Sequence, residues 1–518
     1  MGGAPFRKVL VANRGEIAVR VVRTLRELRI GTVAVYSEAD RGALHARVAD
    51  EAFLVGPGAP AESYLNVERI LDVARRAEAQ AIHPGYGFLA ENAGFARACA
   101  DAGIAWIGPP PEAIELMGSK IEARRLMERA GVPVIPGTAD AVSSADEVVR
   151  LGEEHGWPLA IKASAGGGGK GLKVVSSADE AERALASARR EGETYFSDAT
   201  VYVEKLIEDP RHVEVQVLAD GDGNAIHLGE RDCTIQRRHQ KIVEETPSPA
   251  VTPELRERIG GIALDAARAV GYRSAGTIEG LMDRDGNYYF LEMNTRIQVE
   301  HTITELVTGV DLVREQVLIA AGEPLSLRQE DVQLRGHAIE CRVNAEDPAS
   351  GFLPSPGVIT AYREPAGPGV RVDSGVEAGS EVVGLYDPLV AKLCVWDADR
   401  ERARRRMLRA LEEYVIEGVT TLVPFHRALL SHRCFVAGET CHGLVESSEL
   451  AEEAARLSER QAPAPTPAVM RATGVGPVRE VEVDGRRFTV TLVEPEPPHR
   501  ALARRRRDRS SGARDGAG

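Results

Sequence analysis

The sequence lacks three features, and each absence removes a class of protein. No run of about 18 consecutive apolar residues occurs and no long apolar stretch opens the chain, so we predict neither a membrane span nor a secretion signal. The 6 cysteines are scattered without a C-x-x-C pair, which favours a reduced cytoplasmic setting over a disulfide framework. The formal net charge of −14 argues against a general nucleic-acid binder, because phosphate recognition needs local positive charge.

Soft metal ligands crowd in one place, close to residue 440. His432, Cys434, Cys441 and His442 lie there, but their spacing fits no common zinc pattern. We therefore expect ordinary packing or surface positions for these side chains.

The composition is that of a globular enzyme made of several packed units. Apolar residues form 43% of the chain and charged residues 27%, which is enough to build hydrophobic cores. A chain of 518 residues exceeds the size at which one core keeps growing. We expect roughly three or four units.

The first hundred residues alternate between strand-like and helix-like hydrophobic periods. Strand-like runs occur at 9–12, 32–36, 81–82 and 104–107, and helical spacing occurs at 16–28, 67–77 and 93–102. This alternation predicts an open parallel sheet.

Changes in character along the chain divide it into five predicted segments. They are an N-terminal α/β unit (1–117), a small α+β unit with a Gly-rich hairpin (118–206), a second alternation of strands and helices (207–334), strands followed by a helix at 400–413 (335–445), and a linker region (446–518). Within the last, we predict a stiff Pro-rich linker at 461–467, a strand pair at 479–492 turning at Asp484-Gly485, and a disordered basic tail from 500.

A glycine-rich stretch at 163–171 suits phosphate binding. It lies between strand-like runs at 159–162 and 172–175, and its glycines let backbone N–H groups approach phosphate oxygens. It is not a Walker A loop, because Gly171 rather than Ser or Thr follows the lysine. Lys162 before it and Lys120 upstream would add positive charge. Taken singly, a flexible linker and solvated surface lysines are the alternatives.

Oxygen ligands for a divalent cation follow in the second half of the chain. Glu279, Glu292 and Asn294 are the candidates, and Glu292 ends an apolar run that predicts a buried strand. An unpaired carboxylate there is costly, and Mg²⁺ bound together with ATP phosphates would offset the cost. Strand-end residues facing solvent are the alternative for each residue alone.

These residues in this order resemble the ATP-grasp superfamily, in which a lid and a core subdomain grip ATP. More specific are five motifs at 12–18, 83–89, 230–241, 292–301 and 337–348. They resemble biotin carboxylase motifs, and the resemblance covers roughly residues 7 to 442. It implies an α/β chain with an N-terminal open parallel sheet of the Rossmann-like, pre-ATP-grasp type, an ATP-grasp lid and core, and a C-terminal mixed α+β subdomain.

The resemblance also implies a role for each matching residue. ATP would be bound by Lys120, Lys162, Gly166, Gly167, Gly168, Gly169, Glu204, Lys205, Ile207, His212, Gln236 and His239. Mg²⁺ or Mn²⁺ would be held by Glu279, Glu292 and Asn294, and bicarbonate by Arg296, Gln298 and the backbone of Val299. The catalytic set would be Arg296, Lys241 for developing charge, Glu300 as general base, and Arg342 for the ureido oxygen of biotin. Structural ion pairs are the alternative for Glu300 and Arg342.

Two positions depart from the commoner family pattern. Gly280 stands where a bulky Phe is frequent, which predicts looser packing behind the Glu279 carboxylate. Thr302 stands where Pro is frequent, and we expect it to alter only the loop leaving the bicarbonate site.

No Ala-Met-Lys-Met type motif for biotin attachment occurs, so we expect biotin as a substrate on a separate carrier protein, with a separate carboxyltransferase subunit. A truncated descendant of a fused enzyme would look the same. The resemblance implies a homodimer and, among acceptors, an acyl-CoA before pyruvate. Two other functions stay open: a different ATP-grasp ligase, which leaves the 296–301 run unexplained, and a non-enzymatic role for the arginines at 504–507.

Overall fold

The computed structural model describes residues 4–138, 140–163, 172–196, 198–461, 478–483 and 486–491. The chain divides into a large unit, Met1–Leu457, and a small one, Ser458–Gly518. No helix in the described ranges is both long and apolar enough to cross a membrane.

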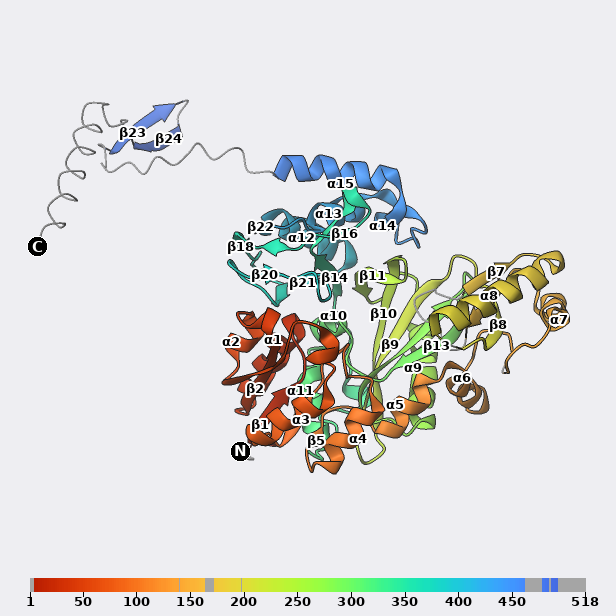
Figure 1. The fold of residues 1–518 in the computed structure, drawn as a ribbon. Helices are drawn as coiled ribbons and strands as arrows, with labels where there is room; N and C mark the ends of the chain where they lie inside the picture. The colour runs from red at the N-terminus through yellow and green to blue at the C-terminus, as the bar shows by residue number, and fades with distance from the viewer. Residues whose placement is uncertain are drawn as a thin grey trace, which may run out of the picture. The chain divides into compact units, whose positions relative to one another are not determined.

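The N-terminal region is the parallel sheet that the alternating periods predict. Its strands are β1 (Lys8–Val11), β2 (Gly31–Ser37), β3 (Glu51–Gly56), β4 (Ala81–His83) and β5 (Ala105–Trp106), in the order β3-β2-β1-β4-β5 and all parallel. The helices α1 (Gly15–Glu27), α2 (Leu44–Val48), α3 (Val67–Arg76) and α4 (Ala93–Asp101) connect them (Figure 1). Strand β3 is the one that hydrophobic periodicity missed, because its burial follows no clear alternation.

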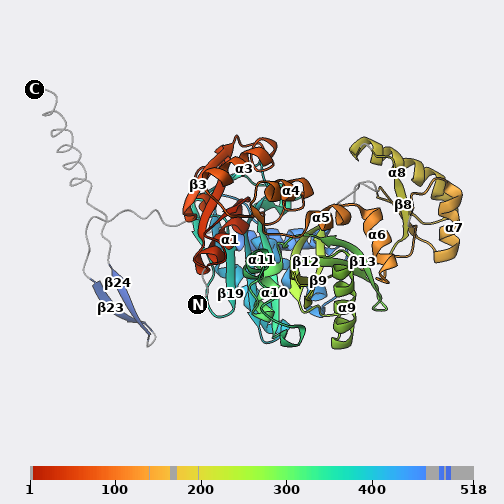
Figure 2. The same cartoon turned by 90° about the horizontal axis from the view of Figure 1, so that it is seen from below.

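Residues 111–205 form the connecting helices and the small α+β region. The helices α5 (Pro111–Gly118) and α6 (Lys120–Arg129) lead into α7 (Ala145–His155) and α8 (Ala181–Phe196). A three-stranded antiparallel sheet has the order β7-β6-β8, from β6 (Leu159–Ala163), β7 (Leu172–Val175) and β8 (Val201–Lys205). Figure 2 shows α7 and α8 beside β8. The glycine-rich residues 164–171, with Gly166 to Gly169, lie outside the described residues.

The largest element is an eight-stranded sheet with the order β13-β12-β9-β10-β11-β14-β21-β19 and antiparallel pairing throughout. Its strands are β9 (Arg211–Ala219), β10 (Ala225–Arg237), β11 (Gln240–Thr246), β12 (Ser274–Met282), β13 (Tyr288–Asn294), β14 (His337–Asn344), β19 (Val370–Ser374) and β21 (Leu389–Asp397). The sheet therefore continues across the segment boundary expected at residue 334. Strands from both sides of that boundary can contribute side chains to one face.

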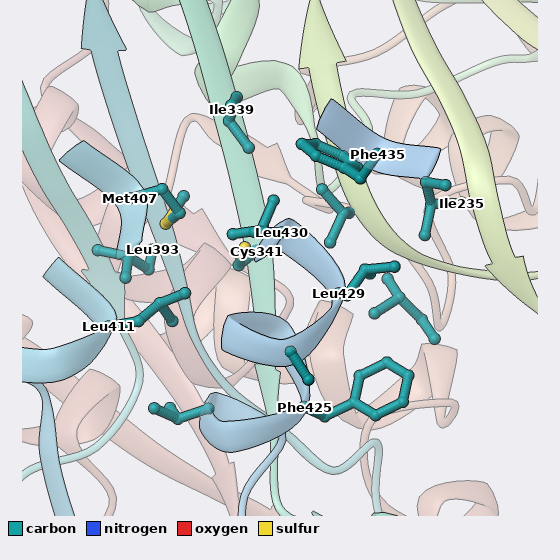
Figure 3. Close-up of a cluster of buried hydrophobic side chains, with 14 of the residues drawn as sticks. Ile235, Ile339, Cys341, Leu393, Met407, Leu411, Phe425, Leu429, Leu430 and Phe435 are labelled. Atoms are coloured by element: carbon teal, nitrogen blue, oxygen red, sulfur yellow. The ribbon is translucent and has the colours of Figure 1, made fainter. Parts of the chain in front are cut away.

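Alternation along β14 sends its side chains to two different environments. Ile339, Cys341 and Val343 enter a buried cluster with α12 (Arg400–Glu413) and α13 (Val423–Ser431), shown in Figure 3. Ala338 packs on the opposite face, against α10 (His301–Thr308). Arg342 lies four residues after Ala338 on the same strand, so its side chain leaves the same face as that of Ala338. This face carries the charged residues described below.

The other α-helices and strands of the large unit are α9 (Pro253–Ala269), α11 (Leu312–Ala320), α14 (Arg433–Ala437) and the short strands β15 (Glu346–Asp347), β16 (Leu353–Pro354), β17 (Gly357–Val358), β18 (Ala361–Arg363), β20 (Glu381–Val382) and β22 (Val415–Glu417). The helix α15 (Ser448–Gln461) begins in the large unit and ends beyond Leu457.

One cysteine pair differs from the expectation of reduced, unpaired cysteines. Cys434 and Cys441 form a disulfide with their Cα atoms 5.6 Å apart, while the other 4 cysteines are buried thiols. The turn after α14, at Gly438 with φ of 71°, reverses the chain and brings the two residues together. Sequence spacing alone does not reveal that reversal.

In the small unit, β23 (Val478–Val483) pairs antiparallel with β24 (Arg486–Thr491). Val483 faces Arg486 in this register, and the turn predicted at Asp484-Gly485 lies outside the described residues. The predicted linker beyond Gln461 and the tail from residue 500 lie outside the described residues.

Candidate functional site

The site is centred on Lys241, which β11 places among three carboxylates. Its Nζ donates to Glu214 at 2.6 Å, to Glu279 at 2.9 Å and to Glu300 at 2.6 Å. Burial alone would lower the pKa of Lys241, but these carboxylates hold it well above its usual range. Lys241 is therefore a permanent positive charge at the centre of the site.

Glu300 is held by a cation on each carboxylate oxygen. It lies at the start of α10, where Oε1 accepts from Lys241 at 2.6 Å and Oε2 accepts from Arg342 at 2.9 Å. Burial would raise its pKa, yet Lys241 and Arg342 outweigh burial and hold that pKa far below its usual range. Glu300 is thus ionised at neutral pH.

Arg342 bridges Glu300 and a second buried carboxylate. Its guanidinium also contacts Glu244 at 2.6 Å. Burial raises the pKa of Glu244 to about 8, even though Arg342 acts to lower it. Both Glu244 and Glu300 are almost completely buried, so water cannot stabilise a negative charge on either side chain. The positive charge of Arg342 does so instead.

The candidate cation ligands lie side by side on two neighbouring strands. Glu279 of β12 is directly opposite Glu292 of β13, and Asn294 Nδ2 donates to Glu279 at 2.7 Å. Two like charges directly across a strand pair destabilise a sheet unless a cation lies between them. Oxygen ligands on a common face fit Mg²⁺ or Mn²⁺. Contrary to the buried position that its apolar run indicated, the Glu292 side chain is 43% exposed.

The loop at 296–299 lies against this carboxylate cluster. Gln298 accepts from Arg231 at 2.6 Å through Oε1 and donates to Glu279 through Nε2. Arg296 donates to Glu91 at 3.0 Å and to Asn294 at 2.8 Å. The structure therefore brings the loop next to Glu279, as expected for residues that share one site.

The remaining ATP candidates lie mainly in the small α+β region and beside the cation candidates. Lys162 donates to Glu204 in the small α+β region, where Arg124 also contacts Glu204 at 2.9 Å. Lys120 lies 3.9 Å from Glu292, next to the cation candidates. The Lys205 side chain donates to the Trp157 carbonyl at 2.7 Å and its backbone N–H donates to the Pro136 carbonyl at 2.7 Å. Ile207, two residues after the end of β8, is only partly buried.

His212 and Gln236 are hydrogen-bonded to each other through His212 Nδ1, and His212 Nε2 lies 2.8 Å from Glu279. Burial would lower the pKa of His212, but Glu279 raises it above its usual value. His239 is exposed in the turn between β10 and β11, with φ of 66°. The structure therefore brings His212 and Gln236 to the cluster, whereas His239 lies at the hairpin tip.

Sequence reasoning missed four charged residues of the cluster. Glu91, Glu214, Arg231 and Glu244 are the missed residues. Arg231 is completely buried and donates to Glu214 at 2.6 Å. A usable signal was present, because charged residues alternating with Val inside buried strands need partners. The sequence His212-Val-Glu-Val-Gln216 has that pattern.

Gly280 does not leave loose packing behind Glu279, contrary to our expectation. A Cβ atom at this position would lie 2.2 Å from the ring of Tyr288, which occupies the space. Tyr288 is buried and its hydroxyl donates to the Ile278 carbonyl at 3.2 Å. Tyr288, a diagonal neighbour on β13, thus fills the volume that a larger side chain at 280 would take.

Gly280→Ala is expected to lower the free energy of unfolding by about 1–3 kcal/mol, because the new methyl group overpacks the Tyr288 ring. Gly261→Ala in α9 is the matched control, since nothing lies within 4 Å of its Cβ position. That control should stabilise the helix by up to about 1 kcal/mol. Urea unfolding of both variants is the measurement. Equal stability of the two variants would show that Tyr288 does not fill this space.

Thr302 also differs from the expectation that it affects only a loop. It is completely buried in the first turn of α10, where its hydroxyl donates to Glu340 and accepts from Cys394 at 3.2 Å. Position 302 therefore connects α10 to β14 and β21, because a hydroxyl can pair with the buried Glu340 carboxylate and proline cannot.

Three family models match successive parts of the chain. The descriptions are "Biotin carboxylase, N-terminal domain" over residues 5–114, "Carbamoyl-phosphate synthase L chain, ATP binding domain" over 119–328, and "Biotin carboxylase C-terminal domain" over 340–447. Together they span the parallel sheet, the small α+β region and the large antiparallel sheet.

Similar proteins match over the same region. A pyruvate carboxylase subunit of Methanothermobacter thermautotrophicus is 57% identical over 84% of this chain and 88% of its own length. Biotin carboxylase 1 of Bacillus subtilis is 54% identical over 84% of this chain and 97% of its own length. The biotin carboxylase domain dimer of Hydrogenobacter thermophilus 2-oxoglutarate carboxylase, solved with MgADP, ADP and bicarbonate, superposes with a TM-score of 0.81 at 49% identity and covers 86% of this chain and 98% of that one. The chain therefore belongs to the biotin carboxylase family of ATP-grasp ligases.

Proposed function

We propose that this chain carboxylates carrier-bound biotin with ATP and bicarbonate, as the first half-reaction of an acyl-CoA carboxylase. The coarser part follows from the family: the chain is a ligase that uses ATP, Mg²⁺, bicarbonate and biotin. The observation that supports the residue roles is the Glu300 carboxylate, ionised and held between Lys241 and Arg342.

For the first step, we assign bicarbonate to the loop containing Arg296, Gln298 and Val299, next to Glu300. Glu300 takes the proton of bicarbonate, and the oxygen so activated attacks the γ-phosphate. An O–P bond forms to give carboxyphosphate, and the bond from that phosphorus to ADP breaks. Lys241 offsets the negative charge that develops between bicarbonate and the γ-phosphate. When bound, Mg²⁺ would be held by Glu279, Glu292 and Asn294 and would neutralise phosphate charge.

For the second step, we assign Arg342 to the ureido oxygen of biotin. Loss of the N1′ proton places negative charge on that oxygen, and a nearby guanidinium stabilises it. The nitrogen then forms a bond to the carboxyl carbon, the bond from that carbon to the phosphate oxygen breaks, and the phosphate released carries away the N1′ proton. Because Arg342 already contacts Glu300, one side chain would serve both steps.

The ATP roles assigned to Lys120, Lys162, the glycines 166–169, Glu204, Lys205, Ile207, His212, Gln236 and His239 are also proposals. They are supported by the cluster of His212 and Gln236 at Glu279 and by the position of Lys120 beside Glu292. A cytoplasmic location stays a prediction from the sequence.

We propose a separate biotin carrier, a separate carboxyltransferase and a homodimer. The Bacillus subtilis relative supports the separation, since this match fills 97% of its length. The solved Hydrogenobacter thermophilus relative is a dimer. Two relatives are named for pyruvate and 2-oxoglutarate carboxylases, so the 2-oxo acids are the competing acceptors. Transfer of labelled carboxyl groups by the complex purified from its native cells, to acetyl-CoA, propionyl-CoA, pyruvate or 2-oxoglutarate, decides between them.

Phosphate release from ATP is expected to require bicarbonate and to increase when free biotin is added. The physical reason is that carboxyphosphate forms only when bicarbonate attacks ATP, and biotin consumes it. The measurement is phosphate release with each substrate omitted in turn. Ammonia-dependent cleavage without a biotin effect would instead indicate a carbamoyl-phosphate type of ligase.

A further inference from the structure

We propose that Lys392 is a positioning residue for the bicarbonate loop, acting on the backbone between Val299 and Glu300. Lys392 is completely buried in β21, and its Nζ donates to the Val299 carbonyl at 2.7 Å. That carbonyl belongs to the peptide group that leads into Glu300. The inference rests on the function proposed for this loop.

The register of the large sheet explains why Lys392 reaches this loop. Lys392 of β21 is directly opposite Arg342 of β14, so the two side chains leave the same face of the sheet. Arg342 reaches the Glu300 carboxylate at 2.9 Å, and Lys392 reaches the carbonyl of the preceding residue. Two neighbouring cations thus hold two successive residues, one by its side chain and the other by its backbone.

A buried lysine is costly unless its charge is paired. Lys392 Nζ lies 3.3 Å from Glu16 Oε2, and Glu16 in turn accepts from the Tyr86 hydroxyl. Glu16 is in the first turn of α1, and Tyr86 follows β4. Both belong to sequence motifs of the N-terminal region for which the proposed chemistry gives no role. Tyr86 holds Glu16, and Glu16 holds the ammonium group of Lys392. We infer that these two motifs orient this group towards the bicarbonate loop.

The placement of the Val299 peptide matters because bicarbonate offers few atoms for recognition. A shift of this peptide would move both the backbone at Val299 and the Glu300 carboxylate, while ATP contacts on β9 to β13 would stay in place. Loss of Lys392 should therefore affect bicarbonate and leave ATP binding largely unchanged.

Lys392→Met keeps the length of the side chain and removes its donor and charge. We expect the Michaelis constant for bicarbonate to rise about tenfold or more, the scale of losing one hydrogen bond from a charged group. The Michaelis constant for ATP should stay within about twofold, since ligand contacts that the mutation does not touch persist. Phosphate release at varied bicarbonate and ATP concentrations measures both constants. A bicarbonate constant equal to that of the wild type would overturn the proposal.

The variant Glu16→Gln/Lys392→Met separates positioning from folding. It removes both members of the Glu16–Lys392 pair, so Glu16 is not left as a buried carboxylate without its cation, and we expect the double variant to fold even if Lys392→Met alone does not. A positioning role keeps the bicarbonate constant high in this variant. Recovery of the wild-type constant would show that Lys392 serves only the ion pair, and would overturn the proposal.

Arg371→Met is the matched control, because Arg371 forms ion pairs with Glu305 and Asp373 on the same sheet face without touching the bicarbonate loop. Its bicarbonate constant should equal that of the wild type, and a comparable rise would overturn the specific role of Lys392. Failure of the proposed function is distinguishable, since the wild-type protein would then show no bicarbonate-dependent ATP cleavage at all.

Discussion

Arg342→Ala is expected to lower carboxybiotin formation by about 10²- to 10³-fold, the scale of losing one oxyanion donor. The charge of Arg342 is needed most when the ureido oxygen of biotin becomes negative. Bicarbonate-dependent ATP cleavage without biotin should fall less, because Lys241 still holds Glu300 through Oε1 at 2.6 Å. The measurement is the ratio of phosphate released to biotin carboxylated, which should rise in the variant.

The variant should fold despite the loss of a buried cation. Arg342 acts to lower the pKa of Glu244, which burial already raises to about 8, so removing Arg342 raises it further. Glu244 therefore stays protonated at neutral pH, and no unpaired buried charge is left there. Circular dichroism and urea unfolding check this point. Arg371→Ala, which breaks ion pairs elsewhere on the sheet face, should leave the ratio unchanged. A proportional loss of both activities in Arg342→Ala would contradict the division of roles.

Glu300→Gln is expected to lower both bicarbonate-dependent ATP cleavage and biotin carboxylation by about 10²-fold or more, the scale of losing a general base. Glutamine retains the size of the side chain and can still accept a hydrogen bond, but it cannot take a proton. The ratio of phosphate to carboxylated biotin should stay near that of the wild type, in contrast to Arg342→Ala. Retention of bicarbonate-dependent ATP cleavage would rule out Glu300 as the base.

The pH dependence offers an independent check on Glu300. Lys241 and Arg342 hold the pKa of Glu300 far below its usual range, so loss of Arg342 raises that pKa towards its usual value. The acid limb of bicarbonate-dependent ATP cleavage should therefore move to higher pH in Arg342→Ala. The same limb should not move in Arg371→Ala, because Arg371 does not contact Glu300. An unmoved acid limb in Arg342→Ala would indicate that another group titrates.

The sequence by itself determined many of the local elements and pointed to residues that the structure brings together. The helix predicted at 400–413 is α12 of the structure. The alternating hydrophobic periods of the first hundred residues predicted a parallel sheet, and the structure has one there. Local periodicity was enough there, because it depends only on which side chains share a face. The motifs around Lys241, Glu300 and Arg342 also pointed to residues that the structure places in contact.

Only the tertiary structure decided which partners these residues have. Glu214 and Glu279 meet Lys241 because β9, β11 and β12 belong to one sheet, and no local pattern specifies that strand order. Register placed the Tyr288 ring over Gly280 and set Lys392 opposite Arg342. The chain reversal after α14 joined Cys434 to Cys441. These contacts join residues distant along the chain, or depend on a turn, and the free energy of burying and pairing charges selects them only after the sheet has assembled.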